Sequence, residues 1–219
     1  MPPQPPRRTT HAYGTPKNLL VYDRWGRYGR PVVFLHGLGY DRTMWWPAAA
    51  DLGGDVAAVA IDLPGHGQSA ARHDCGLPSL VHDLIMLIGG LDLRRAPILV
   101  GHAEAALLAA AFAERCATHA VLAVDEVPAG TDEPDLAGVP EWYRPFAIRR
   151  TDPALQQAYQ SWHTGPSARR AITPAPVLVG TASHAGSERC LPHLRDPAGF
   201  AGLLQTLHEA LGRRGKGRP

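Results

Sequence analysis

Gly101-His102-Ala103-Glu104-Ala105 is the stretch that decides the fold of this 219-residue chain. It follows the short apolar run Ile98 to Val100 and opens an Ala-rich stretch, Ala103 to Cys116, of helical composition. A buried strand that turns directly into a helix is typical of α/β layered proteins. Because ligands in such folds bind at the carboxyl ends of strands, this turn is the first candidate for a functional site.

Two further motifs stand directly after apolar runs. Leu35-His36-Gly37-Leu38-Gly39 ends the run Pro31 to Leu35, and Asp62 to Ser69 (DLPGHGQS) follows Val56 to Ile61. Gly at the end of a strand lets backbone N–H groups approach a ligand closely. All three motifs are therefore expected at the ligand-binding edge of a sheet.

The whole chain alternates short apolar runs with helical stretches, which predicts an α/β fold: a mostly parallel central sheet flanked by helices. Leu19 to Trp25 and Pro31 to Leu35 are separated by a Gly-containing turn, so a hairpin or two neighbouring strands are expected there. The other predicted strands are Val56 to Ile61, Ile98 to Val100, Ala120 to Val124 and Val177 to Val179, and the predicted helices are Ser79 to Ile88, Ala103 to Cys116 and Pro197 to Leu211.

The length suits one domain, which we expect over residues 11–212. Residues 1–10 are Pro-rich with little to bury, so they are expected to be a disordered tail, and residues 213–219 form a basic tail. The alternation of predicted strands and helices stops over residues 129–170, a mixed polar stretch with several prolines and tryptophans. That stretch is the predicted position of a reduced lid.

Composition excludes several classes of function. The formal net charge is only +2 and its excess sits in the two tails, so no nucleic-acid partner is expected. The chain has no apolar run of membrane-spanning length and its start has no apolar signal segment, which predicts a cytoplasmic protein without membrane contact. Three widely spaced cysteines indicate neither a disulfide framework nor a zinc site. We therefore expect a small-molecule substrate, no cofactor and no metal.

Together with Ile172 to Gly180 (ITPAPVLVG) and Pro192 to Pro197 (PHLRDP), the three motifs resemble the α/β-hydrolase superfamily over residues 19–211. The resemblance implies an α/β-hydrolase fold with a shortened C-terminal part and a small lid. In that family the third motif is the nucleophile elbow, G-x-S-x-G, which exposes a catalytic serine. Here Ala103 takes the place of the serine, and a methyl group cannot attack a carbonyl.

The other two positions of the family's catalytic triad also differ. By spacing from Gly180, the position of the acid holds Ser183, and the position of the histidine, two residues before Pro192, holds Cys190. Only eleven residues separate Gly180 from Pro192, where the family fits a helix and a last strand, so both ends cannot be in register. In the alternative register Val177 to Val179 is the last strand, and His184 takes the place of the catalytic histidine.

The resemblance implies that an oxyanion hole remains, formed by the backbone N–H groups of Leu38 and Glu104. Asp125 and Glu126 end the strand beside the elbow strand, where some family members place their acid. The candidate catalytic residues are Asp125, Glu126, His184 and Glu104, and the residues expected to line a substrate pocket are His36, Gly37, Tyr40, His102, Ala103 and Trp142.

Each candidate also has a purely structural interpretation. In that interpretation Asp125, Glu126 and Glu104 are solvated or cap helices. His36, His66 and His102 then bind loop backbone. Asp62 braces a loop, and Trp45 belongs to the core. Cys190 is then a plain buried cysteine.

Three functions remain open. The first is an enzyme with serine-independent chemistry, a lyase, isomerase or cyclase that acts on a small organic substrate, such as a secondary metabolite, through acid–base groups beside the oxyanion hole. The second is a pseudoenzyme that binds a ligand or partner without turnover. The third, a hydrolase that uses Cys190 or an activated water, needs geometry that the sequence does not show. We expect the first.

Overall fold

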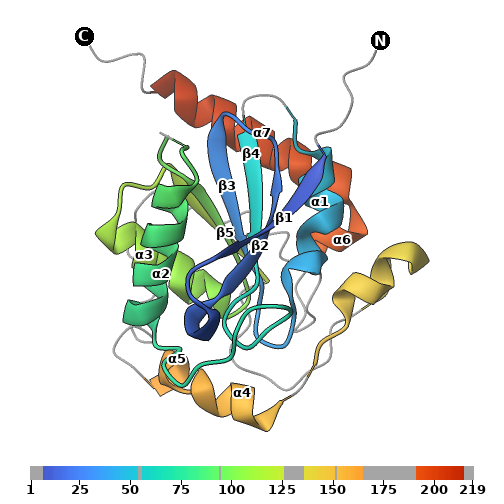
Figure 1. Cartoon of the computed structure of the whole chain (residues 1–219). Helices are drawn as coiled ribbons and strands as arrows, with labels where there is room; N and C mark the ends of the chain where they lie inside the picture. The colour runs from blue at the N-terminus through green and yellow to red at the C-terminus, as the bar shows by residue number, and fades with distance from the viewer. Residues whose placement is uncertain are drawn as a thin grey trace.

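The computed structural model describes residues 7–53, 56–93, 95–125, 136–150, 152–164 and 191–214. A six-stranded sheet in the order β1-β2-β4-β3-β5-β6 forms its centre (Figure 1). Strands β3, β4, β5 and β6 run parallel, while β1 and β2 are antiparallel to their neighbours. The strands are β1 (Arg8–Tyr13), β2 (Leu20–Trp25), β3 (Arg30–Leu35), β4 (Val56–Ile61), β5 (Ile98–His102) and β6 (Ala120–Val124).

Two sequence-based expectations are wrong at the start of the chain. Arg8 to Thr10 belong to β1, where Arg8 is paired with Trp25, so the predicted disordered tail does not extend to residue 10. The hairpin pairing of β2 with β3 is also wrong, because β4 lies between them and pairs with both. The apolar runs located the strands, but burial of β3 on both faces reflects the helix layers above and below the sheet and does not tell which strands pair with it.

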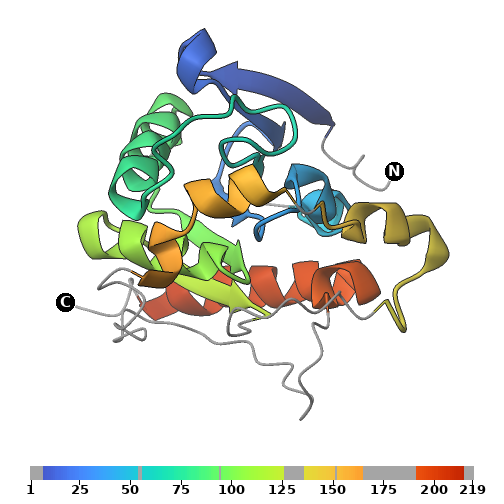
Figure 2. The same cartoon turned by 90° about the horizontal axis from the view of Figure 1, so that it is seen from below.

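Helices cover both faces of the sheet, as Figure 2 shows. The α-helices are α1 (Trp46–Asp51), α2 (Leu77–Gly90), α3 (Ala105–Arg115), α4 (Pro153–Ala158), α5 (Ser161–Thr164), α6 (Pro192–Arg195) and α7 (Pro197–Arg214), and three short 3₁₀ helices are η1 (Pro16–Asn18), η2 (Arg42–Trp45) and η3 (Glu141–Ala147). Helix α7 continues through Arg213 and Arg214, so the basic tail begins inside a helix. No described helix is long and apolar enough to span a bilayer.

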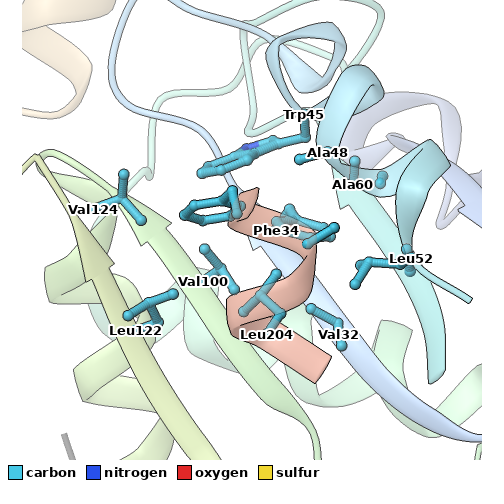
Figure 3. Close-up of a cluster of buried hydrophobic side chains, with 14 of the residues drawn as sticks. Val32, Phe34, Trp45, Ala48, Leu52, Ala60, Val100, Leu122, Val124 and Leu204 are labelled. Carbon is cyan, nitrogen blue, oxygen red and sulfur yellow. The ribbon is translucent and has the colours of Figure 1, made fainter. Parts of the chain in front are cut away.

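Alternate residues of the parallel strands β3 to β6 fill two separate hydrophobic cores, as the period of two in a strand requires. Val32 and Phe34 point to the core under α1 and α7, where Trp45 lies against Phe34 with 5.0 Å between ring centroids (Figure 3). Val33 and Leu35 point to the core under α2 and α3. The double burial explains the continuous apolar runs in the sequence.

The predicted lid stretch contains η3, α4 and α5, and two of these short helices, α4 and α5, lie across the lower end of the sheet in Figure 1. The Tyr159 hydroxyl donates to the Pro64 carbonyl at 2.8 Å, and Trp162 Nε1 donates to the Cys75 carbonyl at 2.7 Å. These buried bonds fix the segment after α4 over the loops at the carboxyl ends of the strands. The predicted strand Val177 to Val179 lies outside the described residues.

Candidate active site

The turn between β5 and α3 has the strained backbone of a nucleophile elbow. Ala103 has φ +50°, a left-handed conformation that costs an L-residue about 1–2 kcal/mol. Its N–H donates to the Val124 carbonyl at 2.8 Å, which holds the turn against the end of β6. A Cβ on Gly101 would lie 2.7 Å from the backbone of Ala105 and Ala106, so only glycine fits where the helix folds back on its strand.

The loop after β3 touches this elbow. A Cβ on Gly37 would lie 2.7 Å from His102 Nδ1 and 3.2 Å from the Ala103 Cβ, so the glycine allows the loop backbone to reach the elbow. Leu38 follows Gly37 in this loop, and Glu104 follows Ala103 at the N-cap position of α3, where its side chain makes no capping bond. Both residues are buried. An oxyanion hole from their two amides stays a prediction.

Two neutral histidines hold the loops together. His36 Nε2 accepts from the Leu63 N–H at 2.9 Å, and His66 Nε2 accepts from the Gly39 N–H at 3.1 Å. In each ring Nδ1 lies close to a backbone carbonyl, 2.9 Å from that of Gly37 for His36 and 3.1 Å from that of Pro64 for His66. Because a carbonyl oxygen only accepts, Nδ1 carries the proton in both rings. Burial lowers the pKa of His36 to about 4 and that of His66 to about 3. The predicted structural role of both histidines is confirmed.

A buried ion-pair network joins the loops after β3 and β4 to strand β2. Arg42 donates through Nε to Asp23 Oδ2 at 3.0 Å, through a second nitrogen to Asp62, and through its backbone N–H to Asp62 Oδ1 at 2.7 Å. Gln68 accepts a further bond from Arg42, and Trp46 Nε1 donates to Asp23 at 2.7 Å. Both carboxylates are fully buried. The expectation that Asp62 braces a loop is confirmed.

Asp125 lies directly behind the elbow at the end of β6. Its Oδ2 is 3.5 Å from His102 Nε2 and accepts from the Leu191 N–H at 2.9 Å. Asp125 has φ +52° and Leu191 φ +39°, so both partners, like Ala103, adopt the left-handed conformation. Three of the four non-glycine residues with positive φ among the described residues therefore meet at this point. Such strain is typical of functional sites.

The surroundings keep the Asp125 carboxylate ionised. Burial alone would raise its pKa, but the contact with His102 lowers it, and the Leu191 amide acts in the same direction. The net effect is a pKa below the usual value of an aspartate. At neutral pH this group is a partly buried anion beside Ala103, able to accept a proton or to stabilise a nearby positive charge.

The structure brings only some of the predicted pocket residues to the elbow. Gly37, His102 and Ala103 are in contact there, and Tyr40 packs edge-on against His102 with 5.1 Å between ring centroids. His36 does not line a pocket, because it is fully buried and both ring nitrogens face backbone groups. Trp142, which is 71% exposed on η3, packs against Tyr143, and its place in a pocket stays a prediction.

Glu126 and His184 lie outside the described residues, as do Ser183 and Cys190. Trp45 is a fully buried core residue, as predicted. Sequence reasoning missed Arg42, Asp23 and His193. His193 stands inside the segment Pro192 to Pro197, whose sequence gives no sign that this ring is buried against Trp45. No three His, Cys, Asp or Glu side chains within the described residues are arranged to hold a metal ion.

The geometry agrees with the comparison to protein families. The model of the α/β-hydrolase family matches residues 32–214 of the chain. The chain therefore belongs to the α/β-hydrolase family, and its fold is the α/β-hydrolase fold.

Curated relatives match shorter stretches. The dihydrolipoyllysine-residue acetyltransferase component of the acetoin cleaving system of Pseudomonas putida is 35% identical over 85 residues, 38% of this chain and 23% of that protein. The (E)-2-((N-methylformamido)methylene)succinate hydrolase of Acinetobacter baylyi is 34% identical over 82 residues, 36% of this chain and 30% of that protein. The matches thus span less than a third of the length of either relative.

Solved structures resemble the chain over a greater share of its length. The Bottromycin epimerase BotH, solved in complex with Bottromycin A2, has a TM-score of 0.62 and 17% identity, with 93% of this chain and 99% of that chain covered. The N-acyl homoserine lactonase AidH has a TM-score of 0.60 and 14% identity, with 79% and 77% covered. At these identities the likeness shows the fold alone.

Proposed function

We propose that this protein is an enzyme that works on the α/β-hydrolase scaffold without a serine nucleophile, by acid–base chemistry on a small organic molecule. The reaction is of lyase, isomerase or cyclase type. The observation that carries the proposal is the meeting of three strained residues, Ala103, Asp125 and Leu191, around one partly buried carboxylate. Each costs stability, and a protein that merely kept the fold gains nothing from them.

The proposed roles follow from position. The ionised Asp125 carboxylate accepts a proton, directly or through His102, whose Nε2 lies 3.5 Å away. The amides of Leu38 and Glu104, with the positive end of α3, stabilise negative charge that develops on a substrate oxygen above Ala103. The methyl group of Ala103 leaves that space free of a competing nucleophile. Glu104 is the second candidate for a proton-transfer group.

Proteins of similar fold catalyse several types of reaction, which agrees with a proposal that covers more than one reaction type. The solved neighbours include an epimerase and a lactonase, and a hydrolase stands among the curated relatives. The scaffold therefore serves more than one reaction class, so fold alone does not select among them. The site of this chain, with alanine at the elbow, favours the classes that need no covalent acyl intermediate.

The test compares variants on a bacterial small-molecule extract by untargeted mass spectrometry. Wild-type protein and the Asp51→Asn control, whose side chain is exposed at the end of α1, are expected to convert at least one compound. Asp125→Asn is expected to slow that conversion by at least a hundredfold, because a general base contributes two to four decades in rate, on the order of 10²–10⁴. Glu104→Gln tests the second candidate group.

Two outcomes contradict the proposal. Equal conversion by wild type, Asp125→Asn and Glu104→Gln would remove both groups from the chemistry. A compound that binds but is recovered unchanged with every variant would instead support a ligand-binding pseudoenzyme. Labelling of the wild type by a fluorophosphonate probe would show a reactive serine and refute the serine-independent reaction.

A further inference from the structure

Arg149 and Arg150 lie on the loop that follows β3. They belong to the link between η3 and α4, within the predicted lid stretch. The Arg149 Nε–H donates to the Leu38 carbonyl at 3.2 Å. The Arg150 backbone N–H donates to the Gly39 carbonyl at 2.7 Å. An arginine of the lid stretch is therefore bonded to Leu38, the residue whose amide is one of the two donors of the proposed oxyanion hole.

Gly39 makes room for the Arg149 side chain. It has φ +87°, and a Cβ there would lie 2.9 Å from the Arg149 Cγ and 2.6 Å from the Arg150 carbonyl oxygen. Any other residue at this position would push the arginine off the loop. Arg149 is partly buried, so its aliphatic stem lies along the loop while its guanidinium stays within reach of solvent.

The guanidinium of Arg149 has no anionic partner within the described residues. Its described hydrogen bond runs from Nε to the Leu38 carbonyl, which is an uncharged group. Asp152 lines the same opening, but its Oδ1 accepts from the Ala154 N–H at 2.9 Å and it forms no ion pair with Arg149. The two terminal nitrogens of Arg149 are thus available to a ligand.

The neighbouring Arg150 differs, because its charge acts on an acid. Asp41 Oδ1 accepts from the Thr43 N–H at 2.9 Å and from the Thr43 hydroxyl at 2.5 Å. Burial opposes the ionisation of Asp41, but these bonds lower its pKa below the usual value, and the charge of Arg150 acts in the same direction. Asp41 is therefore an anion that offsets Arg150, and Arg149 remains the uncompensated cation at this loop.

The loop that holds Arg149 also touches the elbow. A Cβ on Gly37, next to Leu38, would lie 3.2 Å from the Ala103 Cβ. The terminal nitrogens of an arginine form a planar fork that matches the two oxygens of a carboxylate. We propose that Arg149 binds a carboxylate of the substrate, which makes the substrate class a small organic acid. The proposal rests on the reaction proposed above for its purpose, but not for its measurement.

The charge of Asp125 favours the same orientation of the substrate. Like charges repel, so a substrate carboxylate is kept away from the Asp125 anion behind the elbow and is attracted to Arg149 at the loop. The remainder of the molecule then lies over Ala103, between the anion and the cation. A substrate held at one end is also oriented for proton transfer at the other.

The test follows the Arg149 Nε–Hε resonance in ¹H–¹⁵N NMR, assigned by its loss in Arg149→Gln, during titration with succinate or benzoate at low ionic strength. Succinamide and benzamide, which are uncharged, are the control ligands. At least one carboxylate is expected to shift the resonance to saturation, and neither amide is. Arg149→Gln is expected to weaken that binding about tenfold or more, because a hydrogen bond between charged groups contributes on the order of 10–100-fold in affinity.

Two further variants serve as controls. Arg149→Lys keeps the charge but loses the planar fork, so its affinity is expected to lie between those of the wild type and Arg149→Gln. Arg144→Gln is the matched control: Arg144 also donates its Nε–H to a backbone carbonyl, that of Val139 at 3.3 Å, but is exposed on η3. This variant is expected to bind the carboxylate as the wild type does.

The proposal is overturned if neither carboxylate shifts the Arg149 resonance, if the amides shift it equally, or if Arg149→Gln binds as tightly as the wild type. Tighter binding of inorganic phosphate than of either carboxylate would overturn the assignment of the ligand. If Arg149→Gln does not fold, wild-type affinity in Arg149→Lys overturns the proposal, because the fork is then unused. Carboxylate binding combined with full turnover by Asp125→Asn would refute the proposed function alone, and turnover that depends on Asp125 without carboxylate binding would refute the role of Arg149 alone.

Discussion

The two neutral histidines that join the loops predict how stability depends on pH. His66 has a pKa of about 3 in the folded protein, against about 6.5 in an unfolded chain. Between pH 3 and pH 6.5, His66 is protonated in the unfolded chain but neutral in the folded protein. The contribution of His66 to stability is therefore largest above pH 6.5 and is lost as the pH falls toward 3.

The magnitude follows from the number of protons taken up. Between pH 6 and pH 5 unfolding binds nearly one proton at His66, which lowers the free energy of unfolding by about 1.2 kcal/mol. His66→Gln places an amide oxygen near the position of Nε2, where it accepts from the Gly39 N–H but does not titrate. The variant is therefore expected to lose about 1.2 kcal/mol less than the wild type over this interval.

Urea unfolding at pH 7, 6 and 5 measures the difference. For a slope of about 2–3 kcal/mol/M, about 1.2 kcal/mol corresponds to roughly half a molar in the urea midpoint. His73→Gln, at an exposed position, is the control and should follow the wild type at each pH. Identical pH slopes for His66→Gln and the wild type would refute the reasoning, because His66 would then titrate equally in both states.

Three further substitutions test other parts of the structure. Gly37→Ala places a Cβ 2.7 Å from His102 Nδ1 and should cost about 1–3 kcal/mol, measured by thermal unfolding; an unchanged Tm would contradict the close contact. Arg42→Met leaves the buried Asp62 without its cation and should cost about 3–5 kcal/mol in urea unfolding, whereas a loss below about 1 kcal/mol would contradict the buried pair. Ala103→Gly relieves the φ of +50° and should be neutral or stabilising by up to about 1 kcal/mol; clear destabilisation would show that the elbow is unstrained.

Much of the fold was predictable because its parallel strands are buried on both faces. Val56–Ile61 and Ala120–Val124 are continuous apolar runs, and the strands β4 and β6 have these bounds. The pairing of β2 was not predictable in the same way. Its antiparallel contact with β4 depends on a crossover past β3, which no local pattern records.

The site was predictable where a motif requires a backbone shape. The elbow at Ala103 and the carboxylate at Asp125 were both expected from strand ends. Arg42 was missed because an arginine in a polar loop is usually solvated, and only tertiary packing buries it against Asp23. His193 was missed because its surroundings come from distant segments, while the sequence around it shows only a short helix start.

The central claim is that Asp125 accepts a proton in a reaction that uses no serine, and solvent deuterium tests it most directly. For an isomerisation, the compound converted by the wild type in D₂O is expected to gain one mass unit at carbon, since a carbon-bound proton is removed and a solvent-derived one is returned. Asp125→Asn is expected to lose this incorporation. Isomerisation with no deuterium at carbon, or equal incorporation by Asp125→Asn, would contradict the claim.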